Sequence, residues 1–190
     1  MSTREEQKEQ RRSEILNAGL DLFIRKGYTA TKISDIAKEV HMSNGLLFHY
    51  FESKEKLYEE LVRFGLEGTQ KVMQFDSDNP ILFFEIVANG IFQFIREQSS
   101  VAKIFLLMEQ AGHNEAAPQS VKDMVAQVNN ITQSIPLIEA GQKNGSIKEG
   151  NPMALSTAYW CSIQGIAQEL AVHTDYPYPD PSWIVDILRK

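Results

Sequence analysis

The sequence has little cysteine and no long uninterrupted apolar run. Cys161 is the single cysteine among 190 residues, which excludes a disulfide framework within the chain and is typical of a reducing compartment. The longest apolar stretch, residues 81–95, is interrupted by three polar residues, so we expect no segment that spans a bilayer. The first fourteen residues are charged and have no apolar centre, so we expect no secretory signal there. These features predict a cytoplasmic protein without a membrane partner.

The sequence also lacks the patterns that usually mark an enzyme. It has no Gly-rich phosphate loop, no cluster of Cys and His, and no nucleophile motif. Glu109 and His113 stand four residues apart, as zinc ligands on a helix can, but no third ligand is evident. We therefore expect no enzymatic activity, no cofactor and no metal.

Charge is unevenly distributed along the chain. The net charge of −6 argues against a nucleic-acid binder when it is taken as a whole. Residues 1–54, however, carry nine Lys and Arg against eight Asp and Glu, whereas residues 55–190 carry ten against seventeen. The acidity lies outside the N-terminal segment, so that segment stays compatible with DNA.

Helix signals recur along the chain, and strand signals are almost absent. The apolar spacing predicts a first helix over residues 8–25 that stops at Gly27. Short helices are expected after Thr31 and after Ser43, which is a natural N-cap. A fourth helix is expected from residue 54 to about residue 72.

Later helix starts share a capping residue followed by proline. They are Asn79-Pro80, Asn151-Pro152 and Asp180-Pro181. Between them we expect a helix over about residues 99–108 and another over 119–143, which Pro136 should kink or split. The sequence therefore predicts an all-α fold of about nine helices.

Two of these helices have unusual surfaces. The helix over residues 81–95 is apolar almost all round, which predicts a central position among the others. The helix from Pro152 carries a stripe of small residues, Ala154, Ala158, Cys161 and Gly165. Such a stripe permits close approach of another helix, either from a partner chain or from the same chain.

Residues 33–50 fit a helix-turn-helix. Ala37 supplies the small residue that the crossing of two helices needs. Apolar residues fill the angle between the helices: Ile36, Val40, Met42 and Leu47. Ser43, Asn44 and Gly45 provide a cap and a small, polar start for a helix whose N-terminus would enter the major groove. A tight corner between any two helices shares part of this pattern, so at this point a DNA-binding motif and a simple corner both remain open.

A longer ordered run extends the pattern on both sides. It comprises Ile15, Leu16, Ala18, Leu22-Phe23, Gly27-Tyr28, Thr31, Asp35-Ile36-Ala37, Ser43, Gly45, Leu47-Phe48, Tyr50-Phe51, Ser53-Lys54-Glu55 and Leu57. From about Arg12 to Leu61 the sequence resembles the tetracycline-repressor (TetR) family of bacterial transcription regulators. The resemblance implies a DNA-binding helix-turn-helix domain over residues 1–53 and a ligand-sensing and dimerisation domain over residues 54–190.

Within the N-terminal segment, the predicted DNA-binding residues surround the second helix of the motif. They are Tyr28, Thr31, Ser43, Asn44, Gly45, Leu46, Phe48, His49, Tyr50 and Lys54. Asn44 is suited to an adenine edge and Leu46 to a thymine methyl. His49, the Tyr50 hydroxyl and Lys54 are expected to hold phosphates, and Tyr28 and Thr31 to contribute backbone contacts as the resemblance implies. Leu47 and Phe51 are expected to face inward.

Two residues depart from the family pattern. His41 stands where most members have glycine, in a turn that prefers positive φ, so we expect a cost of about 1 kcal/mol there. Phe48 replaces the usual tyrosine and removes a hydroxyl that often reaches a phosphate. Affinity for the DNA backbone should then depend more on Tyr50, His49 and Lys54.

The resemblance also implies a small-molecule site and a homodimer. Ligand-binding candidates are Phe64, Phe84, Phe92, Phe105, Met108, Glu109, Met124 and Tyr159, for which simple core packing is the alternative. Dimer-interface candidates are Ala154, Ala158, Cys161, Gly165, Trp183 and Ile187. We expect a repressor that binds a pseudo-palindromic operator as a dimer and is released by a small molecule. The alternative is an all-α partner-binding protein whose helix-turn-helix no longer binds DNA.

Overall fold

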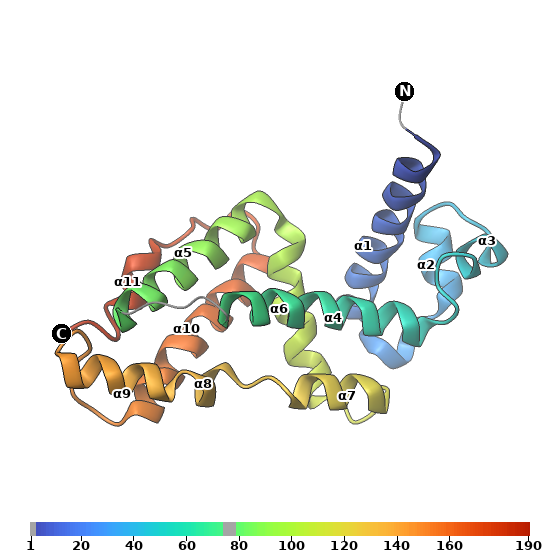
Figure 1. Cartoon of the computed structure of the whole chain (residues 1–190). Helices are drawn as coiled ribbons and strands as arrows, with labels where there is room; N and C mark the ends of the chain where they lie inside the picture. Colours follow the sequence, from blue (N-terminus) through green and yellow to red (C-terminus); the bar gives the residue numbers. More distant parts are fainter. Residues whose placement is uncertain (1–2, 74–78) are drawn as a thin grey trace. The chain divides into compact units, whose positions relative to one another are not determined.

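The structure, a computed structural model, describes residues 3–73 and 79–190, and it confirms the all-α prediction. These two ranges contain eleven helices, and a single β-bridge between Ile147 and Arg189 is their only pairing of extended backbone. The chain packs as two compact units (Figure 1). The first unit comprises residues up to 66 together with 106–127, and the second comprises 67–105 and 128–190. The division into a DNA-binding domain over residues 1–53 and a ligand-sensing domain over residues 54–190 is a functional one, and it stays a prediction.

The first unit contains the N-terminal helices and a short helical pair from later in the chain. Its elements are α1 (Arg4–Ala30), α2 (Ile33–Glu39), α3 (Asn44–Phe48), the first part of α4 (Lys54–Met73), the second half of α6 (Ser99–His113) and α7 (Gln119–Ala126). Gly27 interrupts the helical backbone of α1 with a φ of 79°, at the stop that the sequence predicts. The chain turns there and enters α2.

Apolar and aromatic side chains of α1, α2 and α4 form the core of the first unit. The ring of Phe23 meets Tyr58 edge-on at 4.9 Å between centroids, and Tyr28 lies 4.8 Å from Tyr58. Burial raises the pKa of Tyr58 to about 12. Leu57 packs so closely on Gly19 that a Cβ on this glycine would lie 2.5 Å from the leucine side chain, so α1 and α4 approach each other closely there.

The second unit is built on α5 (Pro80–Glu97) and α10 (Pro152–Val172). Around them lie α8 (Asn130–Gln133), α9 (Ile135–Asn144) and α11 (Pro181–Val185). The segment expected as one helix over 119–143 consists of α7, α8 and α9, and α9 begins with Pro136 at its second position. The predicted split at this proline is confirmed, because the ring cannot continue the helix of α8.

Aromatic side chains with satisfied polar groups fill the core of the second unit. Tyr159 is fully buried, and its hydroxyl donates to the carbonyl of Phe84 at 2.7 Å. Burial also raises the pKa of Tyr159. Trp160 Nε1 donates to Ser134 Oγ at 2.8 Å, and this hydroxyl donates in turn to the Asn130 carbonyl. These bonds fix α10 against α5 and the α8–α9 junction.

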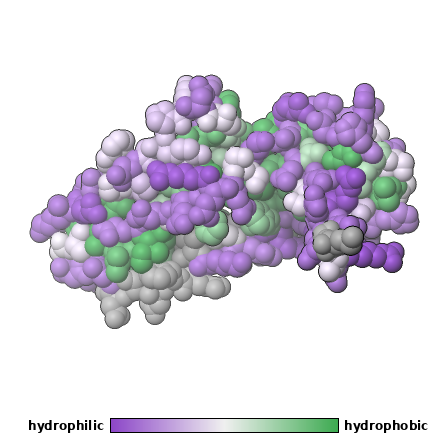
Figure 2. Space-filling model, turned by 90° about the horizontal axis from the view of Figure 1, so that it is seen from above, coloured by the Kyte–Doolittle hydropathy of each residue, from purple (hydrophilic) through white to green (hydrophobic). Residues whose placement is uncertain are grey.

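The expectation that residues 81–95 lie at the centre of the molecule is wrong for the single chain. One face of α5 is buried, but Leu82, Ile86 and Phe94 are 41%, 37% and 57% exposed. Figure 2 shows apolar patches that interrupt an otherwise hydrophilic face of the molecule. Apolar residues all round a helix indicate burial only when neighbours exist on every side, and a single chain does not supply them here.

Candidate nucleic-acid interface

The turn between α2 and α3 has the geometry that the sequence predicts. His41 adopts a φ of 53° and is the only residue other than glycine with positive φ in the described ranges. After the turn, the Met42 amide donates to the Ala37 carbonyl at 2.8 Å. The left-handed conformation costs about 1 kcal/mol for a residue with a Cβ. It sets the angle at which α3 leaves α2.

Helix α3 is short and depends on its surroundings. The Ser43 Oγ accepts from the Leu46 amide at 3.2 Å, which confirms the predicted N-cap. The helix has only five residues, far fewer than an isolated helix needs in water. Its position must therefore come from side chains that pack beneath it.

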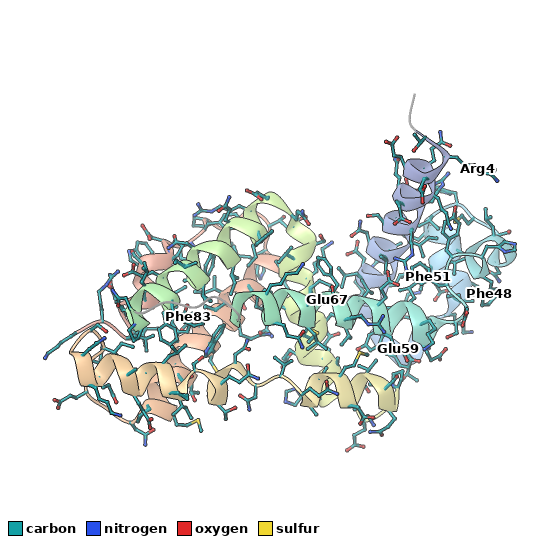
Figure 3. All side chains as sticks on the ribbon, viewed as in Figure 1. Arg4, Phe48, Phe51, Glu59, Glu67 and Phe83 are labelled. Atoms are coloured by element: carbon teal, nitrogen blue, oxygen red, sulfur yellow. The ribbon has the colours of Figure 1, made fainter. Side chains whose placement is uncertain are left out.

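Two apolar side chains anchor α3 to the core. Leu47 is 0% exposed and Phe51 is 4% exposed, so both face inward as expected. The Arg12 guanidinium lies 4.9 Å from the Phe51 ring and also pairs with Glu60 of α4. Figure 3 shows Phe51 near α1 and α4, and Phe48 on the outer side of α3. The two phenylalanines, three residues apart, thus have opposite environments.

The outer face of α3 presents apolar and polar groups together. Leu46 and Phe48 are 45% and 47% exposed, so this face offers apolar groups to a partner. Seven of the ten predicted DNA-binding residues lie on this short segment: Ser43, Asn44, Gly45, Leu46, Phe48, His49 and Tyr50. We call these seven residues the α3 surface. Their contact with DNA stays a prediction.

The structure places Tyr28 and Thr31 beneath the site instead of on its surface. Thr31 is 0% exposed, and its hydroxyl donates to the Gly27 carbonyl at 2.8 Å. Tyr28 is 8% exposed, and its hydroxyl donates to Glu55 at 2.8 Å. The Thr31 side chain thus bonds within α1, and the Tyr28 side chain connects α1 to α4. The contacts with the DNA backbone that are expected of both residues stay a prediction.

Lys54, the first residue of α4, also connects α4 to the end of α1. Its Nζ donates to the carbonyls of Tyr28 and Thr31 at 2.9 and 3.0 Å and lies 4.2 Å from the Tyr28 ring centroid. The phosphate contact predicted for Lys54 stays a prediction. The structural role was missed because its partners lie 26 and 23 residues earlier in the chain, and no local pattern reveals carbonyls at that separation.

Two carboxylates on α4 are stabilised in their charged form. The pKa of Glu55 is lowered by its own backbone amide, then by hydrogen bonds from Tyr28 and Ser53. The pKa of Glu59 is lowered by Lys56 and then by Ser120 of α7, whose hydroxyl lies 2.5 Å from the carboxylate. Conversely, burial and the Glu55 carboxylate raise the pKa of Tyr28. These bonds hold the start of α4 to both α1 and α7.

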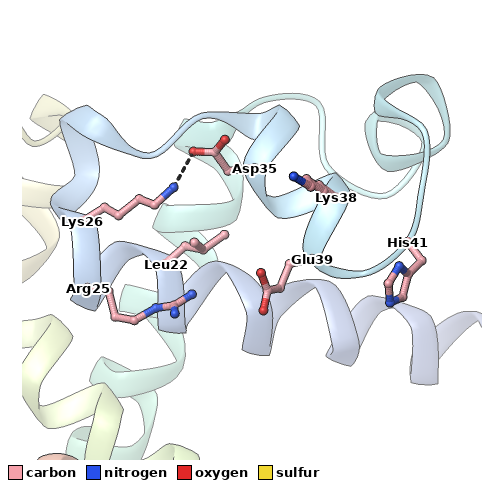
Figure 4. A pocket seen from close by; sticks show the side chains of 7 residues that line it. All are labelled: Leu22, Arg25, Lys26, Asp35, Lys38, Glu39 and His41. Carbon is pink, nitrogen blue, oxygen red and sulfur yellow. Dashed lines mark hydrogen bonds and ion pairs between the residues drawn. The ribbon is translucent and has the colours of Figure 1, made fainter.

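A surface hollow of about 520 Å³ lies beside α1 and α2 (Figure 4). Its charged lining is mixed in sign, and Lys26 pairs with Asp35 at 3.0 Å. None of the predicted ligand-binding residues lines this hollow. The mixed, partly paired charges give no ligand class a clear advantage, and we assign none.

The eight predicted ligand-binding residues are divided between the two units. Phe64, Met108, Glu109 and Met124 belong to the first unit, and Phe84, Phe92, Phe105 and Tyr159 belong to the second. Phe84, Phe92 and Tyr159 are 1% exposed or less and pack in the core, whereas Phe64 is 54% exposed. A common effector site for these residues therefore stays a prediction.

The predicted dimer residues all belong to the second unit and differ in exposure. Ala154, Ala158 and Cys161 of α10 are exposed. A Cβ added at Gly165 would meet nothing within 4 Å. Trp183 of α11 is 67% exposed, and Ile187 is half-buried. The two alanines and the cysteine are therefore not packed inside the single chain, and their role in a dimer interface stays a prediction.

The described residues also bear on metal binding and on membrane insertion. In this part of the chain, no three or more His, Cys, Asp or Glu residues are grouped so that they could hold a metal ion. Among the same residues, no helix has the length and apolar character needed to cross a membrane.

The geometry of α1 to α4 agrees with comparisons to known proteins. Residues 15–61 match the model of bacterial regulatory proteins of the tetR family. The chain carries the N-terminal domain of the TetR family. The matched residues contain the helix-turn-helix, Lys54 and the inward-facing Leu47 and Phe51.

The chain is similar in sequence to two transcriptional regulators. The biofilm operon negative transcriptional regulator IcaR of Staphylococcus aureus is 26% identical over 84 residues, 44% of this chain and 45% of IcaR. The transcriptional repressor KstR2 of Rhodococcus jostii is 29% identical over 150 residues, 73% of this chain and 68% of KstR2. The chain thus spans about half the length of IcaR.

Solved structures show the same fold over nearly the whole chain. The ketosteroid transcriptional regulator KstR2 of Mycobacterium tuberculosis has a TM-score of 0.71 and 18% identity, with 95% of both chains covered. AibR, solved with isovaleryl coenzyme A and operator DNA, has a TM-score of 0.62 and 17% identity, with 93% of this chain and 94% of AibR covered. At these identities the likeness establishes the fold alone.

Proposed function

We propose that this chain is a TetR-family transcriptional repressor that binds a pseudo-palindromic operator as a homodimer and is released by a small molecule. The observation that carries the proposal is the α3 surface, where Leu46 and Phe48 stay exposed beside Asn44, His49 and Tyr50. Exposed apolar groups interleaved with hydrogen-bonding groups suit the edges and methyl groups of bases. The chain would act in the cytoplasm and would not catalyse a reaction.

The homodimer is supported by the exposed small-residue stripe of α10. A two-fold axis would present two α3 surfaces to successive major grooves, about 34 Å apart along the duplex. Two-fold symmetry also predicts that each contact occurs twice and that the operator is a near-palindrome. The relatives IcaR and KstR2 bear the names of a negative transcriptional regulator and a transcriptional repressor, which favours repression.

Release by a small molecule is supported by relatives of the same fold. AibR was solved with isovaleryl coenzyme A, and KstR2 of M. tuberculosis is named a ketosteroid transcriptional regulator. We propose an effector with a largely apolar body for this chain. Such an effector must bind the two states of the repressor with different affinities, typically by 1–3 kcal/mol of coupling.

The test begins with a selection of DNA duplexes from a randomised pool by the purified full-length chain. Fluorescence anisotropy then gives the affinity for the selected sequence and for a scrambled duplex, at about 50 and about 200 mM salt. We expect saturation at two chains per duplex and an affinity at least about a thousandfold above that for the scrambled sequence. Equal affinity for both duplexes would overturn DNA recognition and favour the partner-binding alternative.

Release by an effector is tested on the complex of the chain with the selected duplex. Isovaleryl coenzyme A is the first probe, and free coenzyme A is its matched control because it lacks the acyl group. Release of DNA by the acylated probe alone would support an apolar-bodied effector. If neither compound acts, a wider set of apolar acids and sterols is tested on the same complex.

A further inference from the structure

The first three turns of α1 form an exposed extension. Residues 4–14 contain no buried side chain, and the core begins at Ile15. The matched family segment also begins at residue 15, so the extension precedes it. Thr3 and Glu6 close a capping box through bonds of 2.7 and 3.2 Å, so local hydrogen bonding stabilises the start of the extension. Near its end, Arg12 contacts Phe51 and Glu60.

Three cations line up on one side of this extension. Arg4, Lys8 and Arg11 are spaced by four and three residues, so they share one helix face. Together with Leu46, His49 and Tyr50 they line a surface hollow of about 780 Å³. Glu14 also lines it and pairs with Arg11 at 2.5 Å. Figure 3 shows Arg4 near the free end of α1.

The cation row is unfavourable for the helix that carries it. Positive charge near a helix N-terminus opposes the helix dipole, and like charges three or four residues apart repel each other. No ion pair is described for Arg4 or Lys8 within residues 3–73 and 79–190. Glu5 and Glu6 of the first turn favour the helix start, and Arg11 pairs with Glu14. Because the cation row lines the same hollow as Leu46, His49 and Tyr50, it indicates a partner of opposite charge at this surface.

We propose that Arg4, Lys8 and Arg11 bind DNA phosphates that flank the bases contacted by α3. This inference rests on the proposed operator binding and extends it to a second element of the chain. From residue 4 to residue 11 the helix rises about 10 Å, the axial span of about three phosphates of one strand. Residues 4–14 contain no apolar side chain, so the extension has no face that would enter a lipid surface.

The contact differs in kind from those of α3. Phosphate contacts add affinity without sequence information, whereas base contacts discriminate between sequences. The cations of α1 should therefore raise the affinity for every duplex that extends past the half-site. They should leave the ratio between operator and scrambled DNA unchanged.

The experiment compares the wild-type chain with Arg4→Gln/Lys8→Gln on the selected operator. A matched control, Lys143→Gln/Lys190→Gln, removes the same charge from exposed positions of the second unit. Each lost phosphate contact should reduce the slope of log K against log salt by about 0.9. We expect a slope reduced by about 2 for each chain bound and at least about a tenfold loss of affinity at low salt. The control should keep the wild-type slope.

A second comparison uses operators with and without the flanking base pairs. Trimming should weaken the wild-type chain and leave the double variant unaffected. An unchanged salt slope in the double variant would overturn the inference while wild-type operator binding stands. A reduced ratio of operator to scrambled affinity would also overturn it, because the cations would then position α3 instead. Absence of any specific binding by the wild-type chain would overturn the proposed function itself.

Folding of both double variants is checked by circular dichroism and thermal unfolding. Arg4 and Lys8 are exposed and lie before the first buried residue, so the unfolding temperature should match that of the wild-type chain.

Discussion

The α3 surface and the α10 stripe are both exposed, yet they differ in the size of their side chains and in the groups that surround them. On α3, Leu46 and Phe48 alternate with groups that donate or accept hydrogen bonds. On α10, the exposed residues of the stripe are small: Ala154, Ala158 and Cys161. Mixed groups suit a polar partner with defined edges, whereas small residues suit the backbone of another helix. The exposure of a side chain does not by itself identify a partner. The chemical groups around the exposed side chain indicate which kind of partner it suits.

The two surfaces are also held in place differently. The α10 stripe lies on a helix of 21 residues whose opposite face is locked by Tyr159 and Trp160. The α3 surface lies on a helix of five residues and the turn after it. It depends on Leu47 and Phe51 and on the polar link formed by Lys54, Thr31 and Tyr28. The position of a surface on a long helix is set largely by that helix, whereas the position of a surface on a short helix depends on residues that are distant in the chain.

The largest expected effect comes from a charge placed in the α10 stripe. Ala158→Glu should convert a two-chain species into single chains, because an unpaired carboxylate buried at an interface costs about 3–5 kcal/mol. Light scattering after size-exclusion chromatography measures the molar mass. Ala140→Glu places the same charge on an exposed position of α9 and should leave the molar mass unchanged. A two-chain Ala158→Glu species would show that the stripe is not the interface.

On the α3 surface, the corresponding change should affect sequence recognition and leave assembly intact. Asn44→Ala should reduce the operator affinity by about 1–3 kcal/mol for each half-site, since a paired hydrogen bond to a base is lost. Affinity for scrambled DNA should change little. Anisotropy titrations measure both affinities, with Asn17→Ala as the exposed control on α1. An equal loss on operator and scrambled DNA would indicate a phosphate contact instead.

The polar link beneath α3 should contribute to stability. Lys54→Met retains much of the side-chain length but removes both bonds to the Tyr28 and Thr31 carbonyls. We expect a loss of about 2 kcal/mol in the free energy of unfolding, measured by urea denaturation. The predicted phosphate contact of Lys54 would appear separately, as a reduced salt slope at temperatures where the variant is folded. Unchanged stability would show that the link does not hold the site.

A smaller and pH-dependent effect is expected at the other end of the link. Tyr28→Phe removes one hydrogen bond to Glu55 and should cost about 1 kcal/mol at neutral pH. The folded pKa of Glu55 is lowered from 4.5. The stability this group contributes is therefore present above its unfolded pKa and lost as pH falls through the folded value.

The difference between wild type and Tyr28→Phe should accordingly shrink in acid. Urea denaturation at a series of pH values from neutral downward measures this difference as the Glu55 carboxylate is protonated. Tyr176→Phe, at an exposed position of the second unit, is the control. A difference that stays constant with pH would assign the effect to packing of the ring and not to the Glu55 carboxylate.

The smallest effect is expected in the turn before α3. His41→Gly should relieve the cost of the positive φ and raise the free energy of unfolding by up to about 1 kcal/mol. Gly145→Ala, at a φ of 80° after α9, should have the opposite sign. Thermal unfolding of both variants measures the pair. A destabilised His41→Gly chain would indicate that the imidazole makes a compensating contribution.

Much of the fold was predictable because its signals are local. Helix periodicity, the Ser43 cap, the Gly27 stop and the Pro136 split all depend on residues within a few positions of each other. The same holds for the composition of the α3 surface. The cation row of α1 was also readable from its spacing, but only its position beside α3 gives it meaning.

The sequence by itself determined the all-α class, the helix-turn-helix, the turn at His41 and the identity of the residues that α3 exposes. Tertiary structure alone decided that Lys54, Tyr28 and Thr31 support the site from beneath, because their partners are distant in the chain. It also decided that one face of α5 stays uncovered and that the α10 stripe is free. Burial depends on which elements become neighbours, and local periodicity carries no information about that choice.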